Sequence, residues 1–465
     1  MVQKVLKYKI WNEIPLFYLL PLFICSYFSV GFHHFDEHFQ ILEYANYKMG
    51  YSPASDLPWE FGEKIRPTLQ PWITVLFWKI SNLFFEFNPF QFAFFLRFLT
   101  AVLSVVALVG IRQTFIHTVA PQNVNWYYRF SFLLWFMPFV MVRYSSETWS
   151  ALFFAFGLIF TFSKPKIWKY FLAGLFFASS FWFRFQIAFA FIGLALWILV
   201  YEKQNWQRIV SVFLGFCLSS FIFYKLDCIF YQSQVFTPYN YYYQNIVLKV
   251  AENYGSFGVW YYPVMYLLHL IPPLSIVFLY VFIIFLKQNS KNVVSWIIFF
   301  FLLPHFVISH KELRFLFPLF VFVPFVFEKS MNLVLLLKDK WTSLYSFFII
   351  LNGILLFLSV LKPADINIFN LKQLTNNGEI TKNFFLDKNF DKNYFPGLTM
   401  NYYQAFDSSY NGKNVAYIID TISIGNTLNT PFLIQNNKLK YIFLTKMGDD
   451  FEKFKILRKE NHPKD

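Results

Sequence analysis

The stretch IPLFYLLPLFICSYFSVGFHHFDEHFQ, residues 14–40, joins an almost unbroken apolar run to a group of ionisable side chains. The apolar part, Ile14 to Val30, approaches the length of about 20 residues that a helix needs to cross roughly 30 Å of hydrocarbon. Asp36 and Glu37 follow it directly, with three histidines around them. The stretch therefore predicts a membrane-spanning helix that is followed by a polar segment with carboxylate and imidazole side chains.

Similar apolar runs recur along most of the chain. Of its 465 residues, 57% are hydrophobic and only 14% are charged, whereas soluble globular proteins carry roughly 25% charged residues. These runs predict an α-helical polytopic membrane protein with about 11 transmembrane helices. Predicted spans include residues near 13–31, 90–111, 147–163, 208–225 and 341–361, and a shorter one near 129–143.

The net charge of +14 is explained by membrane topology. Lys and Arg gather in short loops between the apolar runs, which is typical of cytoplasmic loops. No nucleic-acid-binding module is present, so membrane lipid is the expected partner and nucleic acid is not. The alternation of sides predicts a cytoplasmic N-terminus and two long outer loops, residues 32–89 and 226–262.

The composition changes at Lys362, where Asn, Lys and Asp become frequent. Short β-like runs, NVAYIID and KYIFLTK, follow. Residues 1–361 are therefore expected to form a transmembrane catalytic domain. Residues 362–465 are expected to form a small soluble domain, α/β-like and extracytoplasmic.

Five motifs with ionisable residues are placed on the outer side by this topology. One such cluster alone would most often be a solvated loop, but ionisable groups at a membrane boundary are often functional. Five on one face predict a catalytic site. The motifs are FDEHFQ, PWEFGEKIRP, RYSSETW, FWFRF and HKELRF.

The residue types in these motifs suit group transfer. A carboxylate of the Asp36–Glu37 pair could act as a general base towards an acceptor hydroxyl, or the pair could simply end the first helix. Cations on the same side could hold a phosphate, or some could extend towards lipid head groups. These cations are Arg66, Arg143, Arg184, Lys311 and Arg314.

No metal or other cofactor is expected. His33, His34 and His38 could ligate a metal, but histidines at an interface more often donate and accept hydrogen bonds. The three cysteines, Cys25, Cys217 and Cys228, have neither metal-site spacing nor an obvious disulfide pattern.

Together the motifs resemble glycosyltransferase family 22, membrane mannosyltransferases of the GT-C type that extend GPI-anchor and N-glycan lipid precursors. FHHFDEHFQ is similar to the family's His-Pro-Asp-Glu-x-x-Gln signature, and HKELRFLFP to its His-Lys-Glu-x-Arg-Phe-x-x-Pro pattern. PWEFGEKIRP is also similar, and RYSSETW and residues 227–247 are weaker matches. The chain departs from the family pattern at Phe35, Pro58 and Pro67.

The resemblance implies an inverting mannosyltransferase. Its donor would be a polyprenyl-phosphate-linked mannose, and its acceptor a glycan or glycolipid that gains an α-mannoside. Asp36 would be the catalytic base, and Glu37 would orient the acceptor or support Asp36. The resemblance implies that the substrates would be bound by Glu60, Arg66, Arg143, Glu147, His310, Lys311, Glu312 and Arg314, of which His310, Lys311 and Arg314 would hold the lipid phosphate. Arg184 is expected to bind substrate with them, as a cation on the same side of the membrane.

Other functions fit parts of the pattern. A GT-C enzyme for another sugar could use the same carboxylate pair. A lipid-linked-sugar flippase would have polar residues near the membrane midplane and two halves that are structural repeats of each other. A non-catalytic scaffold would not need a carboxylate pair facing cations. The composition favours a bacterial cell membrane, with the endoplasmic reticulum as the alternative, and the acceptor stays open.

Overall fold

The computed structural model describes residues 14–365 apart from residues 86, 116–122, 165, 203–205 and 332–341, together with short pieces of the tail, 368–369, 372, 384–386, 403–405, 416–421 and 454–459. The chain forms two compact units. The first comprises the described parts of Met1–Tyr27, Pro58–Ile73 and Phe95–Leu361, and the second those of Phe28–Leu57, Thr74–Phe94 and Lys362–Asp465.

The first unit is helical. Its first half contains η3 (Leu16–Leu19), α1 (Leu20–Phe28), α4 (Trp59–Gly62), α5 (Leu69–Ser81), α6 (Pro89–Thr114), α7 (Val124–Phe132), α8 (Met137–Val142), α9 (Ser146–Phe162), α10 (Ile167–Phe183), η7 (Phe185–Ile187) and α11 (Ala188–Tyr201). The elements that follow are α12 (Trp206–Tyr231), α13 (Thr237–Tyr242), η8 (Tyr243–Val247), η9 (Val250–Tyr254), α14 (Tyr261–His269), α15 (Leu274–Gln288), α16 (Val293–Val307), η10 (Leu313–Phe322), α17 (Val323–Lys329) and α19 (Thr342–Leu361). Helices α1, α5 and α6 also contribute residues to the second unit.

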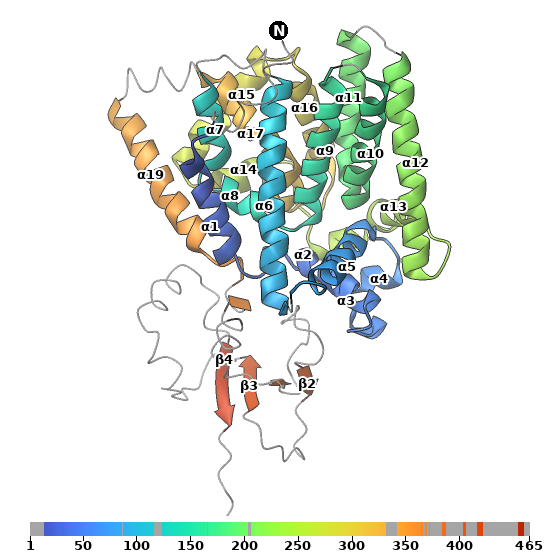
Figure 1. Cartoon of the computed structure of the whole chain (residues 1–465). Coiled ribbons are helices and arrows are strands. Elements are labelled where there is room, and N and C mark those ends of the chain that lie inside the picture. The colour runs from blue at the N-terminus through green and yellow to red at the C-terminus, as the bar shows by residue number, and fades with distance from the viewer. Residues whose placement is uncertain are drawn as a thin grey trace, which may run out of the picture. The chain divides into compact units, whose positions relative to one another are not determined.

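Helices α9, α10 and α12 lie side by side, with α10 in the middle (Figure 1). The α10–α12 contact is made by two glycines. A Cβ on Gly174 would lie 2.1 Å from the carbonyl oxygen of Val212, and one on Gly215 would lie 2.1 Å from that of Phe171. Small residues let helix backbones approach closely in membrane proteins, so a larger side chain at either position would separate α10 from α12.

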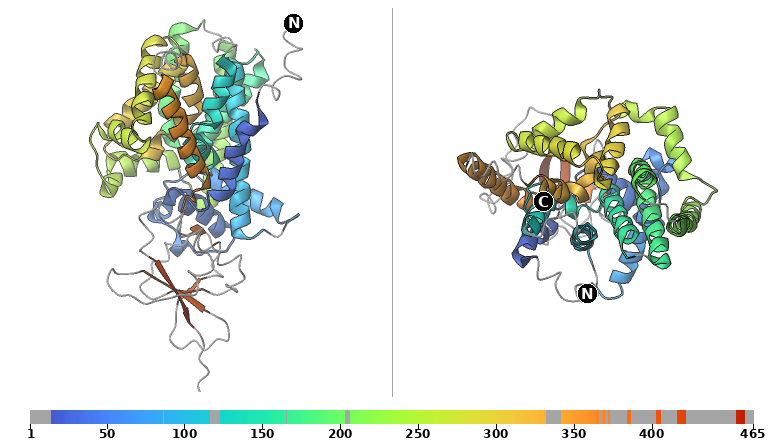
Figure 2. Two further views of the ribbon diagram at one scale, coloured as in Figure 1. Left: turned by 90° about the vertical axis from the view of Figure 1, so that its left-hand side faces the viewer. Right: turned by 90° about the horizontal axis from the view of Figure 1, so that it is seen from above.

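Three helices are long and apolar enough to cross a membrane: α6, α12 and α19. A fourth candidate is the pair α15 and α16, which is bent by 119° at its break. The view from above in Figure 2 shows several helices of the first unit nearly end-on. The chain is therefore an α-helical membrane protein, as predicted, whereas the number of about 11 spans stays a prediction.

The expected span near residues 129–143 is divided in the structure. Helices α7 and α8 are separated by a short break, and Pro138 occupies the first turn of α8. Asn352 of α19 fills the break, since its Nδ2 donates to the carbonyl of Leu133 at 2.8 Å and its Oδ1 accepts from the backbone N–H of Trp135 at 3.1 Å. Broken helices within a membrane require such partners for their backbone groups.

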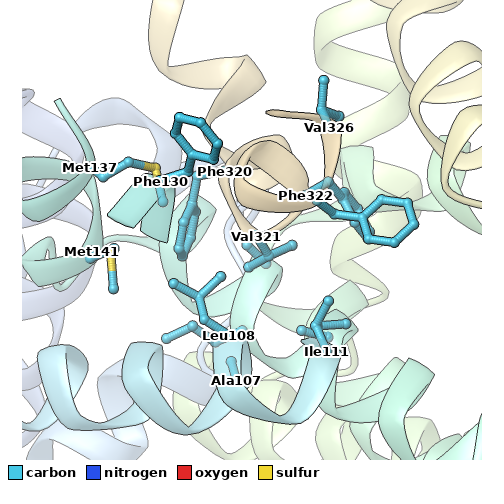
Figure 3. Packing of buried hydrophobic residues seen from close by; sticks show 14 of the residues in the cluster. Ala107, Leu108, Ile111, Phe130, Met137, Met141, Phe320, Val321, Phe322 and Val326 are labelled. Carbon is cyan, nitrogen blue, oxygen red and sulfur yellow. The ribbon is translucent and has the colours of Figure 1, made fainter. Parts of the chain in front are cut away.

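The core of the first unit is apolar and centred on η10 (Figure 3). Phe320, Val321 and Phe322 of η10 pack with residues of α6, including Leu108 and Ile111. Pro318 lies inside η10, and proline cannot donate the backbone hydrogen bond that an α-helix needs there. The 3₁₀ helix η10 begins at Leu313, is embedded in the core and continues into α17.

The second unit contains α2 (Phe35–Glu37), the π-helix η4 (His38–Leu42), α3 (Glu43–Lys48) and η5 (Ala54–Asp56). The backbone N–H groups of Ala364 and Asp365 donate to the carbonyl of Val30 at 2.9 and 3.0 Å. Gly31 has a φ of +87°, and a Cβ there would lie 2.6 Å from the Cβ of Asp365. The chain just before FHHFDEHFQ is thus held against the start of the tail.

The tail carries a four-stranded sheet in the order β2-β1-β3-β4, with β1 parallel to β2 and β3, and β3 antiparallel to β4. The strands are β1 (Phe384–Leu386), β2 (Tyr403–Ala405), β3 (Ala416–Thr421) and β4 (Phe454–Lys459). The NVAYIID run overlaps β3, whereas KYIFLTK lies outside the described residues. The soluble domain over residues 362–465 stays a prediction.

Candidate active site

Glu147 is placed at the start of α9 by a capped helix end. The Ser145 side chain accepts a hydrogen bond from the backbone N–H of Thr148 at 3.2 Å and so caps α9. Glu147 lies in the first turn, where the helix dipole favours a negative charge. Its side chain is only 2% exposed, so this carboxylate needs cationic partners.

Two arginines supply positive charge next to the Glu147 carboxylate. Nη2 of Arg184 lies 3.3 Å from Oε1 of Glu147, and Nη1 of Arg314 lies 3.0 Å from the same oxygen. Arg184 directly follows the last residue of α10, and Arg314 lies at the start of η10. Three motifs that are far apart in the sequence, RYSSETW, FWFRF and HKELRF, therefore meet at one carboxylate oxygen.

Phe315 supports both guanidinium groups. The Cζ atoms of Arg184 and Arg314 lie 5.1 and 5.3 Å from the centroid of its ring. A guanidinium over an aromatic face is attracted by the ring's negative face. The last residue of HKELRF thus positions the two arginines.

Glu312 extends the network. Its Oε2 accepts from Nε of Arg314 at 2.5 Å, and its Oε1 lies 2.9 Å from Nε2 of His310. Nδ1 of His310 lies 3.0 Å from the carbonyl oxygen of Gly255. The hydrogen bond to Glu312 raises the pKa of His310 above its usual value, although partial burial opposes the shift.

Lys311 contacts backbone rather than side chains. Its Nζ donates to the carbonyl oxygens of Phe257, at 3.0 Å, and of Ile308. The side chain is buried, and this burial lowers the pKa of its ammonium group. These bonds and the contact of His310 with Gly255 hold the chain before α14 against HKEL.

The PWEFGEKIRP motif forms a second ion pair. Nη2 of Arg66 donates to Oε1 of Glu60 at 3.2 Å, and its guanidinium lies 5.7 Å from the ring centroid of Tyr241. The Tyr241 hydroxyl accepts from Nε2 of Gln186 at 2.5 Å. Because Gln186 is two positions after Arg184 in the chain, Tyr241 connects the Glu60–Arg66 pair to the segment that carries Arg184.

Asp227 was not predicted as a site residue. It is fully buried in α12, and its Oδ1 accepts from the backbone N–H and Oγ1 of Thr68 at 2.8 and 2.5 Å. Its Oδ2 accepts from Oγ1 of Thr237 at 2.6 Å. Asp227 is the sole acid in the apolar sequence of α12, which by itself marks a residue that needs explanation.

Arg143 and the carboxylate pair complete the predicted set. Arg143 is buried just after α8, and its guanidinium lies 5.1 Å from the ring centroid of Phe139. Asp36 and Glu37 belong to α2 in the second unit. His34 caps α2 by accepting from the backbone N–H of Asp36 at 3.2 Å.

Glu37 and His38 make their own local contacts. Oε2 of Glu37 accepts from the backbone N–H of His33 at 3.3 Å, and Nε2 of His38 lies 2.7 Å from Oε1 of Glu43. Within the residues that the structure describes, no three His, Cys, Asp or Glu side chains gather as metal ligands would. The expectation of no metal stays a prediction.

Of the predicted residues, Glu147, Arg184, His310, Glu312 and Arg314 form one contiguous network in the first unit, and Glu60 and Arg66 form a pair. Buried charges cost free energy unless they are paired. Two guanidinium groups around one carboxylate oxygen form a rigid site that could meet an anion such as a phosphate ester.

The fold and this network of charges belong to a helical membrane protein of a known family. Residues 14–375 match the Alg9-like mannosyltransferase family, so the chain belongs to that family. Membership confirms the family and the enzyme class, a glycosyltransferase, that were predicted from the motifs.

Two relatives are GPI-anchor enzymes. The chain is 27% identical over 321 residues to GPI mannosyltransferase 3 of Candida albicans, a match that covers 67% of this chain and 61% of that protein. It is 25% identical over 303 residues to GPI alpha-1,2-mannosyltransferase 3 of Xenopus laevis, covering 61% of this chain and 53% of that protein. The chain thus spans less than two thirds of each relative's length.

Among solved structures, the chain is similar to the crystal structure of ArnT from Cupriavidus metallidurans bound to undecaprenyl phosphate. The TM-score is 0.46 at 11% sequence identity, and the match covers 78% of this chain and 72% of that one.

Proposed function

We propose that this protein is an inverting mannosyltransferase that takes mannose from a polyprenyl-phosphate carrier and transfers it to a lipid-linked glycan or glycolipid on the outer side of the membrane. The observation that carries the proposal is the convergence of Arg184 and Arg314 on Oε1 of Glu147, in a chain of the Alg9-like mannosyltransferase family.

The arginines act on the donor phosphate. When the bond between the mannose C1 and the phosphate oxygen breaks, negative charge grows on the departing polyprenyl phosphate. Fixed cations stabilise that charge best where water is excluded, and both guanidinium groups are buried. Glu147, Glu312 and Phe315 hold these two arginines in place, while Lys311 and His310 hold the neighbouring backbone.

Asp36 acts on the acceptor. Its carboxylate takes the proton of the acceptor hydroxyl as that oxygen forms a bond to C1 on the face opposite the phosphate. Configuration at C1 is inverted, so a β-linked donor yields an α-mannoside. Glu37 supports Asp36, and Glu60 and Arg66 line the sugar or acceptor pocket.

The test is a transfer assay. Purified protein is incubated with radiolabelled polyprenyl-phosphate mannose and a lipid extract from its own cells, beside an Asp36→Asn variant. We expect label in a lipid or glycan product only with the parent protein, and digestion with linkage-specific α-mannosidases identifies the bond.

Controls separate loss of chemistry from loss of fold. Asp36→Asn should keep the elution volume and the thermal unfolding midpoint of the parent. Glu252→Gln alters an exposed carboxylate outside the proposed site and should transfer normally. Normal transfer by Asp36→Asn would remove Asp36 from the mechanism. Activity with another polyprenyl-phosphate sugar, and none with mannose, would overturn the proposed donor.

A further inference from the structure

The segment from Phe236 to Leu248, which contains α13 and η8, turns its polar side towards the protein. Nδ2 of Asn240 donates to the carbonyl oxygens of Glu63 and Lys64, both at 3.3 Å. Nε2 of Gln244 donates to Oε2 of Glu63 at 2.6 Å. The amides on this side therefore fasten the segment to the motif that carries Glu60 and Arg66.

The apolar side of the same segment is exposed. Its residues recur at intervals of three or four, which places them along one face of a helix. Each is 40% exposed or more, and two of them, Tyr239 and Tyr243, stack with their centroids 6.1 Å apart. We call this face the aromatic stripe; it consists of Phe236, Tyr239, Tyr242, Tyr243, Ile246 and Val247.

This orientation is the reverse of that of a helix at the surface of a soluble protein. A helix at the surface of a soluble protein directs its apolar face to the core and its polar face to water. Contiguous exposed apolar side chains mark a surface that meets another apolar phase. Tyrosines in such a position are typical of the boundary between lipid and water.

The stripe continues an exposed face of α12, one of the helices long enough to span the membrane. The two segments lie together at the end of α12 (Figure 1). The rings of Tyr224 and Phe236 are in contact with their centroids 6.3 Å apart, and exposed Phe221, Ile222 and Ile229 lie along the same helix. The apolar surface of α12 therefore extends onto the aromatic stripe.

Lys225 places a charge on α12 beside two aromatic rings, as is typical of a lysine near lipid head groups. Nζ of Lys225 lies 5.4 Å from the ring centroid of Phe221 and 5.3 Å from that of Tyr224. A lysine on the lipid-facing side of a spanning helix places its stem along apolar surface and its ammonium among the head groups. Tyr224 contacts Phe236, so the stripe begins at that same level.

We propose that residues 236–248 form an interfacial membrane helix whose aromatic stripe is immersed in the lipid leaflet, not a loop in water. The partner is the acyl and glycerol region of the bilayer, which fits exposed Phe, Ile and Val side chains flanked by tyrosine hydroxyls. Because Asn240 and Gln244 hold Glu63 and Lys64 on the other side, this helix fastens the Glu60–Arg66 segment to the membrane surface.

The experiment measures immersion directly and needs no enzymatic activity. In a background with Cys25, Cys217 and Cys228 replaced by alanine, single cysteines are introduced as Tyr243→Cys and Val247→Cys and labelled with a nitroxide. Each protein is reconstituted into phosphatidylcholine vesicles. Power saturation then compares collisions with oxygen, which concentrates in lipid, and with a water-soluble nickel chelate.

Two positions serve as references. Leu218→Cys reports the exposed face of α12, and Asn253→Cys reports an exposed polar position shortly after η8. We expect labels at 243 and 247 to collide severalfold more with oxygen than with the nickel chelate, as at 218, and the reverse at 253.

Two outcomes overturn the proposal. Labels at 243 and 247 that meet the nickel chelate as readily as the label at 253 place the stripe in water. Labels shielded from both reagents show that protein covers the stripe. All four substitutions are at exposed positions, and unchanged elution from a sizing column confirms that each labelled protein is folded.

Discussion

Arg314 and Glu147, which are 167 positions apart in the chain, form an ion pair with 3.0 Å between Nη1 and Oε1. Arg184 contacts the same oxygen from the end of α10. The start of α9, the end of α10 and the start of η10 are thus joined through one buried carboxylate. The two charges proposed to meet the donor phosphate therefore depend on Glu147 for their position.

Replacing Glu147 should destabilise the fold as well as stop transfer. Glu147→Gln removes the negative charge between two buried guanidinium groups, and removing one partner of a buried pair typically costs about 3–5 kcal/mol. We expect a lower thermal unfolding midpoint in detergent. The matched control is Glu252→Gln, because Glu252 forms an exposed pair with Lys249 at 3.8 Å and exposed pairs contribute about 0–1 kcal/mol. Equal midpoints for the two variants would contradict a structural dependence on Glu147.

Replacing Arg314 should impair use of the donor, through weaker binding or slower transfer. Arg314→Lys keeps a positive charge but loses the planar fork of N–H groups that fits a phosphate. A hydrogen bond to a charged group contributes about 1.5–3 kcal/mol, so we expect kcat/KM for the donor to fall roughly 10- to 100-fold, through a higher KM or a lower kcat. Initial rates over a range of donor concentrations measure this.

The control for Arg314 is Arg208→Lys. Arg208 is also ion-paired, with Nη1 2.5 Å from Oε2 of Glu202, but neither residue belongs to the proposed site. That variant should keep the KM and the kcat of the parent. Parental values of both KM and kcat for Arg314→Lys would make Arg314 a structural residue only.

Asp227 is expected to act as a positioning residue. Asp227→Ala removes the acceptor for Thr68 and Thr237, so the segment that carries Glu60 and Arg66 should loosen and the KM for the acceptor should rise. Asp227→Asn can still accept from Thr68 through Oδ1 and donate to Thr237 through Nδ2, so it should restore most of the parental KM. If alanine and asparagine have equal effects on KM, the hydrogen bonds are not the cause.

His310 should make stability depend on pH. Its folded-state pKa is raised, chiefly by the hydrogen bond to Glu312, above an unfolded value of about 6.5. Its stabilising contribution is therefore fully present below about pH 6.5 and is lost as the pH rises through the folded-state pKa. We expect His310→Gln to lower the unfolding midpoint most at acidic pH. A difference from the parent that grows with pH would reverse the assignment.

Metal removal should leave transfer unchanged. The ring of His34 contacts Asp36, and that of His38 contacts Glu43 at 2.7 Å, so both rings already have partners inside the protein. In the proposed mechanism arginines stabilise the leaving phosphate, which is the task that a divalent cation would otherwise perform. The check is the transfer rate after treatment with EDTA. A loss that added Mg²⁺ or Mn²⁺ restores would overturn the expectation.

Several features of the fold could be predicted from sequence. The runs near residues 90–111 and 208–225 are uniformly apolar and of spanning length, and they are the helices α6 and α12. Breaks inside apolar runs were not predicted. The division between α7 and α8 depends on Asn352, which is more than 200 positions away, and hydropathy contains no information on which residue fills a gap in a neighbouring helix.

Some features of the candidate site could also be predicted from sequence, and others could not. Charged residues in RYSSETW, FWFRF and HKELRF were recognisable because a charge inside an apolar sequence is costly and so requires a reason. The distances between these residues could not be predicted from sequence. Ion pairs between Glu147, Arg184 and Arg314 form only when three separate helix ends pack together. Asp227 is likewise a charged residue inside an apolar sequence, that of α12. Its partners Thr68 and Thr237 come from other segments, so the sequence alone did not indicate what it contacts.

The sequence by itself determined that the chain is a helical membrane protein of a mannosyltransferase family, because hydropathy and short motifs act locally along the chain. Only the tertiary structure decided which charges share a carboxylate and which face of residues 236–248 is exposed. Ion pairing and burial depend on distances between residues that are remote in sequence, and packing alone sets those distances.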